Sequence, residues 1–185
     1  MISPKFFVEC LKNNSIDFFA GIPDSLLKHF CAYLKDTVPV QNNVIAANEG
    51  GAMGLAVGYY LATGRIPLVY MQNSGLGNVI NPLLSLVDKE VYNIPMVLLI
   101  GWRGEPGIHD EPQHIYQGEV TLKLLEDMDI ATFVIGKETT EAELYAKMKE
   151  FRNVLTNGKS VAFVVRKGAL EYGNKVVYSN EYQMK

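Results

Sequence analysis

Short apolar runs alternate with amphipathic segments along most of the 185-residue chain. Alternation of this kind is typical of strands that are each followed by a helix. The run at 94–101 is apolar throughout, as expected for a strand that is buried on both faces of a parallel sheet. The pattern predicts six strands, at residues 16–23, 43–48, 67–72, 94–101, 130–136 and 160–166.

Helical patterns fill the intervals between these runs. The N-terminal pattern has Ser3 in the N-cap position and Pro4 in the first turn, and the pattern at 139–158 is closed by Gly158. Asp24 or Ser25 can cap a helix over 24–36. Further helices are predicted at 48–65, 79–90 and 120–128. Because a helix follows each of the first five strands, we predict an α/β fold: a six-stranded, mostly parallel, doubly wound sheet with helices on both faces.

Sheets of this type place their binding sites beyond the carboxyl ends of the strands. Three stretches fall there in this sequence: "NVIAANE", "QNSGLGN" and the long loop "GWRGEPGIHDEPQH". Candidate functional residues are therefore sought in these three stretches.

The predicted helix at 48–65 is rich in glycine. Gly50, Gly51, Gly54 and Gly58 each cost about 1 kcal/mol relative to alanine inside a helix. Small residues allow a neighbouring helix or a flat ligand to approach the helix backbone closely. Glu49 at the start of this helix is either a first-turn acid favoured by the helix dipole or a functional carboxylate.

The turn "SGLGN" resembles a dinucleotide-binding fingerprint, but Ile80 occupies the position of its last glycine. The turn can bind a phosphate at a helix N-terminus or serve only as a tight connection. A nucleotide-binding α/β protein is therefore one alternative for the function.

The long loop carries His109, Asp110, Glu111 and His114. Their spacing does not match a pair of metal ligands on one helix face, so no metal site is predicted in this chain. Each histidine is either solvated or functional, and long loops in compact domains are often functional. Arg103 can bind an anion or form a surface salt bridge.

Composition narrows the classes of partner. Hydrophobic residues make up 48% of the chain, charged residues 20%, and the net charge is −3 without a basic run, which argues against binding to nucleic acid or a membrane surface. The N-terminus lacks the pattern of a signal peptide, and no apolar run is long enough to span a membrane. Cys10 and Cys31 are predicted to be reduced thiols, so we expect a cytoplasmic protein.

Taken together, these motifs resemble the pyrimidine-binding (PYR) domain of thiamine-diphosphate enzymes. "NEGGAMGLAVGYYLATGRIPLVYMQNSGLGN" carries the acid, the small-residue helix and the "SG-x-G-x-x-N" turn of that family, and "GIPDSLL" resembles the "G-x-P" loop of its 2-oxo-acid decarboxylases. With "GWRGEPG…DEPQH", the sequence is similar to phosphonopyruvate decarboxylases and to sulfopyruvate decarboxylase α subunits. The resemblance implies a PYR-type domain over 1–168, followed at 169–185 by a C-terminal tail or the start of an interdomain linker.

The resemblance implies roles for the residues that match the family's motifs. Glu49 would hydrogen-bond N1′ of the aminopyrimidine of thiamine diphosphate, and Arg103 and His109 are candidates to bind an anionic group of the substrate. Further residues implied near the cofactor are Gly50, Ser74, Gly75 and Asn78. Further catalytic candidates are Asp24, Ser25 and His114.

The resemblance also implies a missing half. The family binds the diphosphate and Mg²⁺ through a "GDG…N" motif of a pyrophosphate-binding (PP) domain, and no "GDG" occurs in this chain. We therefore expect an α subunit or the N-terminal piece of a longer enzyme, completed by a PP domain or a β subunit, in a homo-oligomer.

The implied reaction, a step of phosphonate biosynthesis, converts phosphonopyruvate, a small 2-oxo acid, to phosphonoacetaldehyde and CO2. A sulfopyruvate decarboxylase α subunit is one alternative, and a non-catalytic α/β binding module is another.

Overall fold

The six predicted strands form one parallel sheet. The computed structural model describes residues 1–173, in which the strand order is β2-β1-β3-β4-β6-β5 and every neighbouring pair is parallel. The strands are β1 Phe19–Gly21, β2 Asn43–Ile45, β3 Leu68–Gln72, β4 Val97–Gly101, β5 Ala131–Ile135 and β6 Val161–Val165. The predicted sheet is confirmed, and the fully apolar run at 94–101 supplies the central strand β4, which is buried along its whole length.

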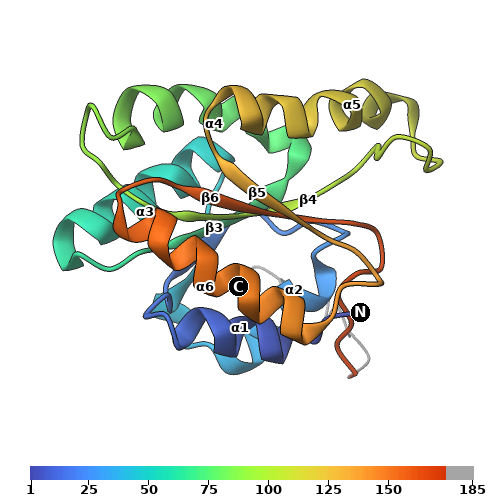
Figure 1. The fold of residues 1–185 in the computed structure, drawn as a ribbon, viewed down its shortest axis with the longest axis horizontal. Coiled ribbons are helices and arrows are strands. Elements are labelled where there is room, and N and C mark those ends of the chain that lie inside the picture. Colours follow the sequence, from blue (N-terminus) through green and yellow to red (C-terminus); the bar gives the residue numbers. More distant parts are fainter. Residues whose placement is uncertain (174–185) are drawn as a thin grey trace, which may run out of the picture.

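Helices cover both faces of the sheet, as predicted (Figure 1). Helices α1, α2 and α6 pack on one face, where Phe7, Phe30 and Phe163 form a chain of ring contacts. Helices α3, α4 and α5 pack on the other face, over residues such as Leu98 and Val164. Their bounds are α1 Pro4–Lys12, α2 Lys28–Thr37, α3 Glu49–Thr63, α4 Leu76–Pro82, α5 Pro112–Asp127 and α6 Glu141–Thr156.

Helix α1 begins at Pro4 as predicted, whereas the start of α2 differs from the prediction. Ser3 occupies the N-cap position of α1, but its side chain makes no capping hydrogen bond. Helix α2 begins at Lys28 and not at residue 24, because the Asp24 carboxylate accepts hydrogen bonds from the backbone N–H groups of Leu26 and Leu27. Asp24 therefore holds a separate turn before the helix, and neither Asp24 nor Ser25 is its cap.

The connections around α4 and α5 are also more helical than predicted. After a single 3-10 turn at Asn73–Gly75, α4 begins at Leu76 and continues as a π-helix over Leu83–Val87. Pro82 lies just before this change, and its missing N–H interrupts the regular α-helical ladder. Helix α5 begins at Pro112, so the last residues of the predicted 102–114 loop form its first turn.

The start of the predicted C-terminal tail is packed against the domain. Ala169 and Leu170 belong to the core, and the Ala169 carbonyl accepts a hydrogen bond from the Ile2 N–H at 2.8 Å. Residues 174–185 of the predicted tail lie outside the described residues.

Two properties of the described chain concern the predictions about membrane spans and cysteine thiols. No helix within residues 1–173 has the length and hydropathy to cross a membrane. Cys10 and Cys31 are free thiols, and burial raises the pKa of Cys31 to about 12, so this thiol is protonated at neutral pH.

Candidate active site

The strand order brings four polar loops to one edge of the sheet. The loops that follow β1, β3 and β4 leave adjacent strands, and β2, which leads into α3, pairs with β1 at the side. Strand β4 runs toward the right-hand edge in Figure 1 before the chain turns back into α5. The order of the strands reverses at β1, since β2 pairs with one side of β1 and β3 pairs with the other. Open α/β sheets bind ligands at such a point.

Glu49 is the first residue of α3, and two features fix its side chain. Asn48 caps the helix by accepting a hydrogen bond from Gly51 N at 2.8 Å. The Asn78 amide donates to Glu49 Oε2 at 2.8 Å, and a Cβ atom built on Gly75 would lie only 2.5 Å from Glu49 Cγ. The half-buried carboxylate of Glu49 is therefore held between the Asn78 amide and the Gly75 backbone.

Glu49 Oε1 accepts no hydrogen bond from any residue in the range 1–173. Gly50, next in the helix, approaches the backbone carbonyl of Asn78, since a Cβ built there would lie 3.5 Å from that oxygen. The structure thus brings together Glu49, Gly50, Gly75 and Asn78 from two separate motifs. It leaves one carboxylate oxygen of Glu49 available for a ligand donor.

Asp24 is buried, with 7% of its surface exposed, and holds the β1 loop to the end of β3. Its Oδ1 accepts a hydrogen bond from Gln72 Nε2 at 2.7 Å, and Oε1 of the same Gln72 side chain accepts one from Ser74 Oγ at 2.8 Å. Ser74 adjoins Gly75, so this hydrogen-bonded chain connects Asp24 to the turn that supports Glu49. Both Asp24 oxygens have protein partners, so Asp24 holds the β1 loop and the β3 turn together, and the catalytic role implied for it stays a prediction.

Arg103 directs its guanidinium toward Asp110 and Ser25. Its Nε donates to Asp110 Oδ2 at 2.8 Å, Nη2 forms a second bond to Asp110 Oδ1, and Nη1 donates to Ser25 Oγ at 3.2 Å. The Gly104 N–H also donates to Asp110. The Arg103 guanidinium therefore holds the pKa of Asp110 well below its usual range. This bidentate pair fixes the loop after β4 in a tight bend.

The two predicted histidines lie apart from this network. His109 is exposed in the loop, and His114 is half-buried in the first turn of α5. Within residues 1–173, no hydrogen bond joins either imidazole to Glu49, Asp24 or Arg103. The roles implied for both histidines stay predictions.

Gln72 and Asn73 are the site residues that the sequence analysis did not select. Gln72 connects Asp24 to Ser74, and Asn73 is fully buried, with its amide donating to the Arg103 carbonyl at 2.8 Å and to Thr121 Oγ1 at 2.9 Å. The sequence does contain a signal for these two residues: they are polar, and they lie between an apolar strand and a glycine-containing turn. Buried polar groups at such positions need partners, and here the partners are the neighbouring loops.

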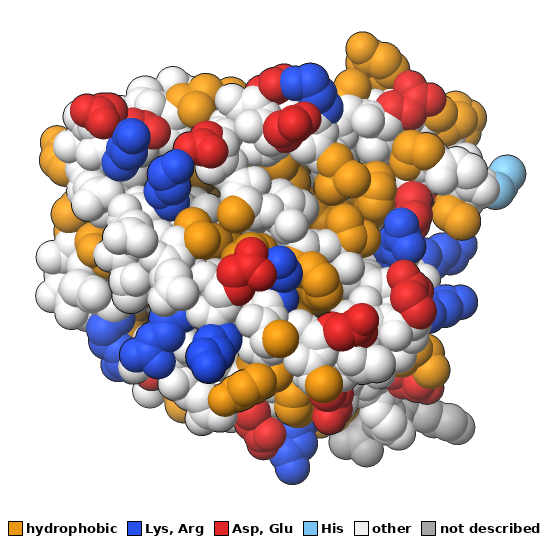
Figure 2. Space-filling view, viewed as in Figure 1, with side chains coloured by type: hydrophobic (Ala, Val, Ile, Leu, Met, Phe, Trp, Pro, Cys, Tyr) orange, Lys and Arg blue, Asp and Glu red, His pale blue; other side chains and the backbone are white. Residues whose placement is uncertain are grey.

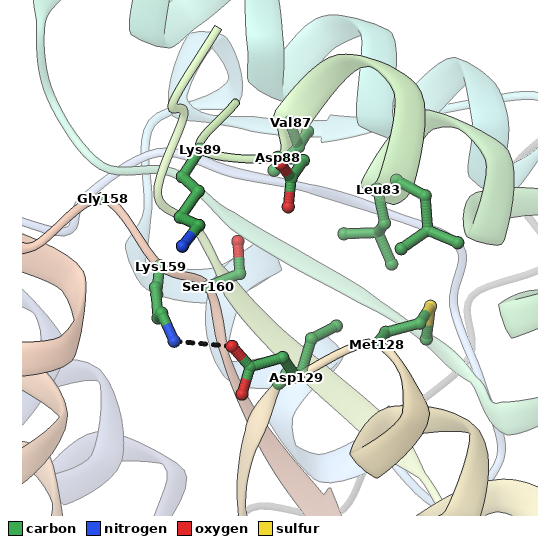
Figure 3. A pocket seen from close by; sticks show the side chains of 11 residues that line it. Leu83, Val87, Asp88, Lys89, Met128, Asp129, Gly158, Lys159 and Ser160 are labelled. Atoms are coloured by element: carbon green, nitrogen blue, oxygen red, sulfur yellow. Dashed lines mark hydrogen bonds and ion pairs between the residues drawn. The ribbon is translucent and has the colours of Figure 1, made fainter. Parts of the chain in front are cut away.

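Another hollow lies at the opposite edge of the sheet, near the starts of β5 and β6 (Figure 3). Its volume is about 60 Å³, and Lys159 and Asp129 form an ion pair across it. Such a hollow holds no more than a few water molecules. No group of three or more His, Cys, Asp or Glu side chains in the described part of the chain could hold a metal ion.

The parallel sheet and the carboxylate at its carboxyl edge agree with the PYR-type thiamine-diphosphate-binding domain that the sequence motifs resemble. Residues 4–125 match the family model described as "Thiamine pyrophosphate enzyme, N-terminal TPP binding domain". This match covers more than half of the chain, so the chain belongs to this family. The predicted family, fold and cofactor, thiamine diphosphate, are confirmed.

The relatives of this chain include two groups of decarboxylases. The chain is 35% identical to a phosphonopyruvate decarboxylase of Streptomyces viridochromogenes, over 76% of this chain and 34% of the relative. It is also 35% identical to a sulfopyruvate decarboxylase subunit alpha of Methanococcus maripaludis, over 80% of this chain and 84% of the relative. The chain thus spans about a third of the first relative and most of the second.

Solved structures support the fold. The benzoylformate decarboxylase of Polynucleobacter necessarius superposes with a TM-score of 0.65 at 16% identity, over 95% of this chain and 32% of the other. The thiamine diphosphate-dependent 4-hydroxybenzoylformate decarboxylase of Rhodococcus jostii gives a TM-score of 0.62 at 20% identity, over 95% of this chain and 34% of the other.

Proposed function

We propose that this chain is the PYR-type part of a thiamine-diphosphate-dependent 2-oxo-acid decarboxylase that acts on phosphonopyruvate. The observation that carries the proposal concerns Glu49: its carboxylate is held between Asn78 and Gly75, and its Oε1 accepts no hydrogen bond from the described residues. A carboxylate fixed in this way, with one oxygen unused, fits the aminopyrimidine of thiamine diphosphate. The names of the relatives support the reaction.

Within this proposal the chain's own residues bind and orient the cofactor. Glu49 Oε1 would hold the hydrogen bond to N1′ of the aminopyrimidine, and Asn78 would keep the carboxylate in place. Gly75, which carries no side chain, leaves room for the Glu49 carboxylate, and Gly50 lets the Asn78 backbone approach the start of α3. Ser74, Gln72 and Asp24 hold the β1 loop and the β3 turn in register. When bound, thiamine diphosphate supplies the carbanion and the electron sink that decarboxylation needs.

The alternative substrate is sulfopyruvate, since the phosphonopyruvate decarboxylase of Streptomyces viridochromogenes and the sulfopyruvate decarboxylase subunit alpha of Methanococcus maripaludis are both 35% identical to the chain. Phosphonopyruvate and sulfopyruvate both carry a tetrahedral anionic group beside the 2-oxo acid. A comparison of CO2 release from both substrates separates the alternatives.

The proposal includes a PP domain or β subunit that binds the diphosphate and Mg²⁺, and a homo-oligomer. Two features support an outside partner. The sequence contains no "GDG" motif, and the outer side of α3 exposes Leu55 and Leu61 beside Gly54 and Gly58. Contiguous exposed apolar surface of this kind is typical of interfaces. Light scattering of the chain with and without its partner measures the assembly.

The deciding experiment is CO2 release with thiamine diphosphate and Mg²⁺ in the enzyme completed by its PP domain or β subunit. Phosphonopyruvate, sulfopyruvate and pyruvate are compared, first with the unchanged chain and then with Glu49→Gln. We expect Glu49→Gln to lower kcat by about 100-fold or more, since it removes the group that handles a proton. Glu119→Gln, an exposed change on α5, serves as the matched control.

The same pair of variants tests the alternative of a non-catalytic binding module. Turnover by the unchanged chain and the control, but not by Glu49→Gln, contradicts that alternative. Near-normal turnover by Glu49→Gln would overturn the proposed role of Glu49.

A further inference from the structure

A basic groove lies beside the Glu49 site, between the carboxyl ends of β4, β5 and β6 and the start of α2. Its volume is about 810 Å³, within the range of small-molecule sites. Ser25 and Arg103 belong both to its wall and to the strand-end network described above. The groove therefore adjoins the candidate active site without containing Glu49. Its cationic lining residues are Lys28, Arg103, Lys137, Arg166 and Lys167.

The two arginines of the groove are already paired with its carboxylates. Arg103 is bound by Asp110, and Arg166 lies 2.8 Å from Glu105 and 3.2 Å from Glu138. These three carboxylates are the acidic groups that line the groove.

The three lysines of the groove form no ion pair with any carboxylate of residues 1–173. With five cations and three carboxylates, the groove carries a net charge of +2, whereas the whole chain carries −3. Figure 2 shows Lys and Arg side chains gathered at the right-hand edge, where β5 and β6 end in Figure 1. An uncompensated positive charge in a hollow attracts anions from solution.

The floor of the groove is rigid. Arg166 lies over the Trp102 ring, 6.0 Å from its centre, and Trp102 Nε1 donates to the Gly118 carbonyl at 2.9 Å. On the α2 side, His29 Nδ1 accepts a hydrogen bond from the Tyr172 N–H at 3.2 Å. Lys28 and Lys167 are each next in sequence to a residue that these contacts hold in place.

We propose that the basic groove binds a tetrahedral oxoanion through Lys28, Lys137 and Lys167. A planar carboxylate is matched best by the fork of an arginine, and both arginines here are already occupied by protein carboxylates. An ammonium group is a point charge without a preferred plane, and it suits a phosphate, phosphonate or sulfonate equally well. Ser25 Oγ accepts from Arg103, so its own O–H is available as a further donor.

The ligand can come from two sources with this shared chemistry. One is the terminal phosphonate or sulfonate of the substrate, in which case the inference rests on the proposed function. The other is free phosphate, which is independent of it. Arg103, a candidate for the substrate anion from sequence, then shapes the groove through Asp110 and Ser25, while the lysines bind.

Amide chemical shifts of the ¹⁵N-labelled full chain test the proposal without turnover or cofactor. Inorganic phosphate and phosphonoacetate are titrated at constant ionic strength maintained with chloride. We expect saturable shifts at Lys28, His29, Lys137, Lys167 and Gly168. Tighter binding of phosphonoacetate than of phosphate identifies a substrate-type ligand, and equal binding identifies a phosphate site.

The combined variant Lys137→Gln and Lys167→Gln should weaken this binding by about tenfold, on the scale of two exposed charge contacts. Lys28→Gln should weaken it by a smaller factor. Lys149→Gln, an exposed lysine of α6 outside the groove, is the control and should leave binding unchanged. Thermal unfolding of each variant shows that the fold is intact.

Three outcomes would overturn the proposal: shifts that do not saturate, equal shifts with chloride alone, or equal weakening by Lys149→Gln. Failure of this test leaves the CO2 assay and Glu49→Gln unaffected. Conversely, a chain that binds phosphonoacetate in the groove but supports no decarboxylation contradicts only the proposed function.

Discussion

Gly75 and Glu49 lie so close together that no side chain fits between them. A Cβ atom built on Gly75 would lie 2.5 Å from Glu49 Cγ and 2.6 Å from Oε1, far inside ordinary contact distance. Gly75 belongs to the turn after β3 and Glu49 to the start of α3, so their contact joins two motifs that are distant in the sequence. The position of the proposed proton-handling oxygen therefore depends on the absence of a side chain at residue 75.

Gly75→Ala is expected to displace the Glu49 carboxylate and to weaken binding of thiamine diphosphate by about tenfold, which corresponds to about 1.4 kcal/mol. Calorimetric titration of the enzyme completed by its PP domain or β subunit measures the change. Gly77→Ala is the matched control, because a Cβ at Gly77 meets nothing within 4 Å. Equal cofactor affinity of the two variants would contradict the positioning role of Gly75.

The glycines of α3 divide into two sets with different consequences. Cβ atoms built on Gly50 and Gly51 would contact Asn48 Oδ1, whereas Cβ atoms built on Gly54 and Gly58 would meet nothing within 4 Å. Each of these two glycines weakens the helix without a reason inside the described chain. Space kept open on a helix surface is suited to the close approach of a partner.

Gly54→Ala and Gly58→Ala should each raise the free energy of unfolding of this chain by about 1 kcal/mol, because alanine is the better helix former. Urea denaturation measures this gain. The same changes should weaken assembly with the partner in light scattering. Gly21→Ala is the opposite control, since its Cβ would lie 2.2 Å from the Tyr70 carbonyl oxygen and should destabilise the chain. Unchanged assembly of the α3 variants would contradict an interface at these glycines.

The sequence predicted the sheet well because each strand is a short apolar run of the right length. It also placed Glu49 and the "SGLGN" turn at the same edge, since both follow strands. It did not predict that the Asp24 side chain is buried and that α2 begins only at Lys28. The position of the Asp24 side chain depends on a hydrogen bond from the Gln72 amide of a neighbouring strand. Nor did it predict that Arg103 pairs with Asp110, since residue types alone left an anion site and a salt bridge equally open.

Asn73 should be among the most sensitive residues of the site. Its fully buried side-chain Nδ2 donates to the Arg103 carbonyl and to Thr121 Oγ1, and its side-chain Oδ1 accepts from the Arg103 N–H at 3.1 Å. Asn73→Ala removes the partners of the Arg103 carbonyl and N–H and one of the two partners of Thr121 Oγ1, so we expect a loss of about 3 kcal/mol in the free energy of unfolding.

Urea denaturation at neutral pH measures the effect of Asn73→Ala. The exposed change Asn153→Ala on α6 serves as the control and should be neutral or slightly stabilising. A loss below about 1 kcal/mol for Asn73→Ala would show that the neighbouring loops do not depend on this amide.

The ion pair of Arg103 and Asp110 should make the stability of the β4 loop depend on pH. The pKa of Asp110 in the folded chain lies well below its ordinary value of about 3.9, so the pair contributes fully above about pH 4 and is lost as the pH falls toward the folded pKa. Asp110→Asn should therefore lower the free energy of unfolding by about 1–2 kcal/mol at pH 7, with a difference that shrinks below about pH 4. Urea denaturation of both chains between about pH 7 and pH 2 measures this difference.

Asp127→Asn, which removes an exposed partner of Lys123, is the control and should change stability by less than about 0.5 kcal/mol. If the effect of Asp110→Asn were the same at every pH, its cause would be lost packing and not the lost charge of residue 110.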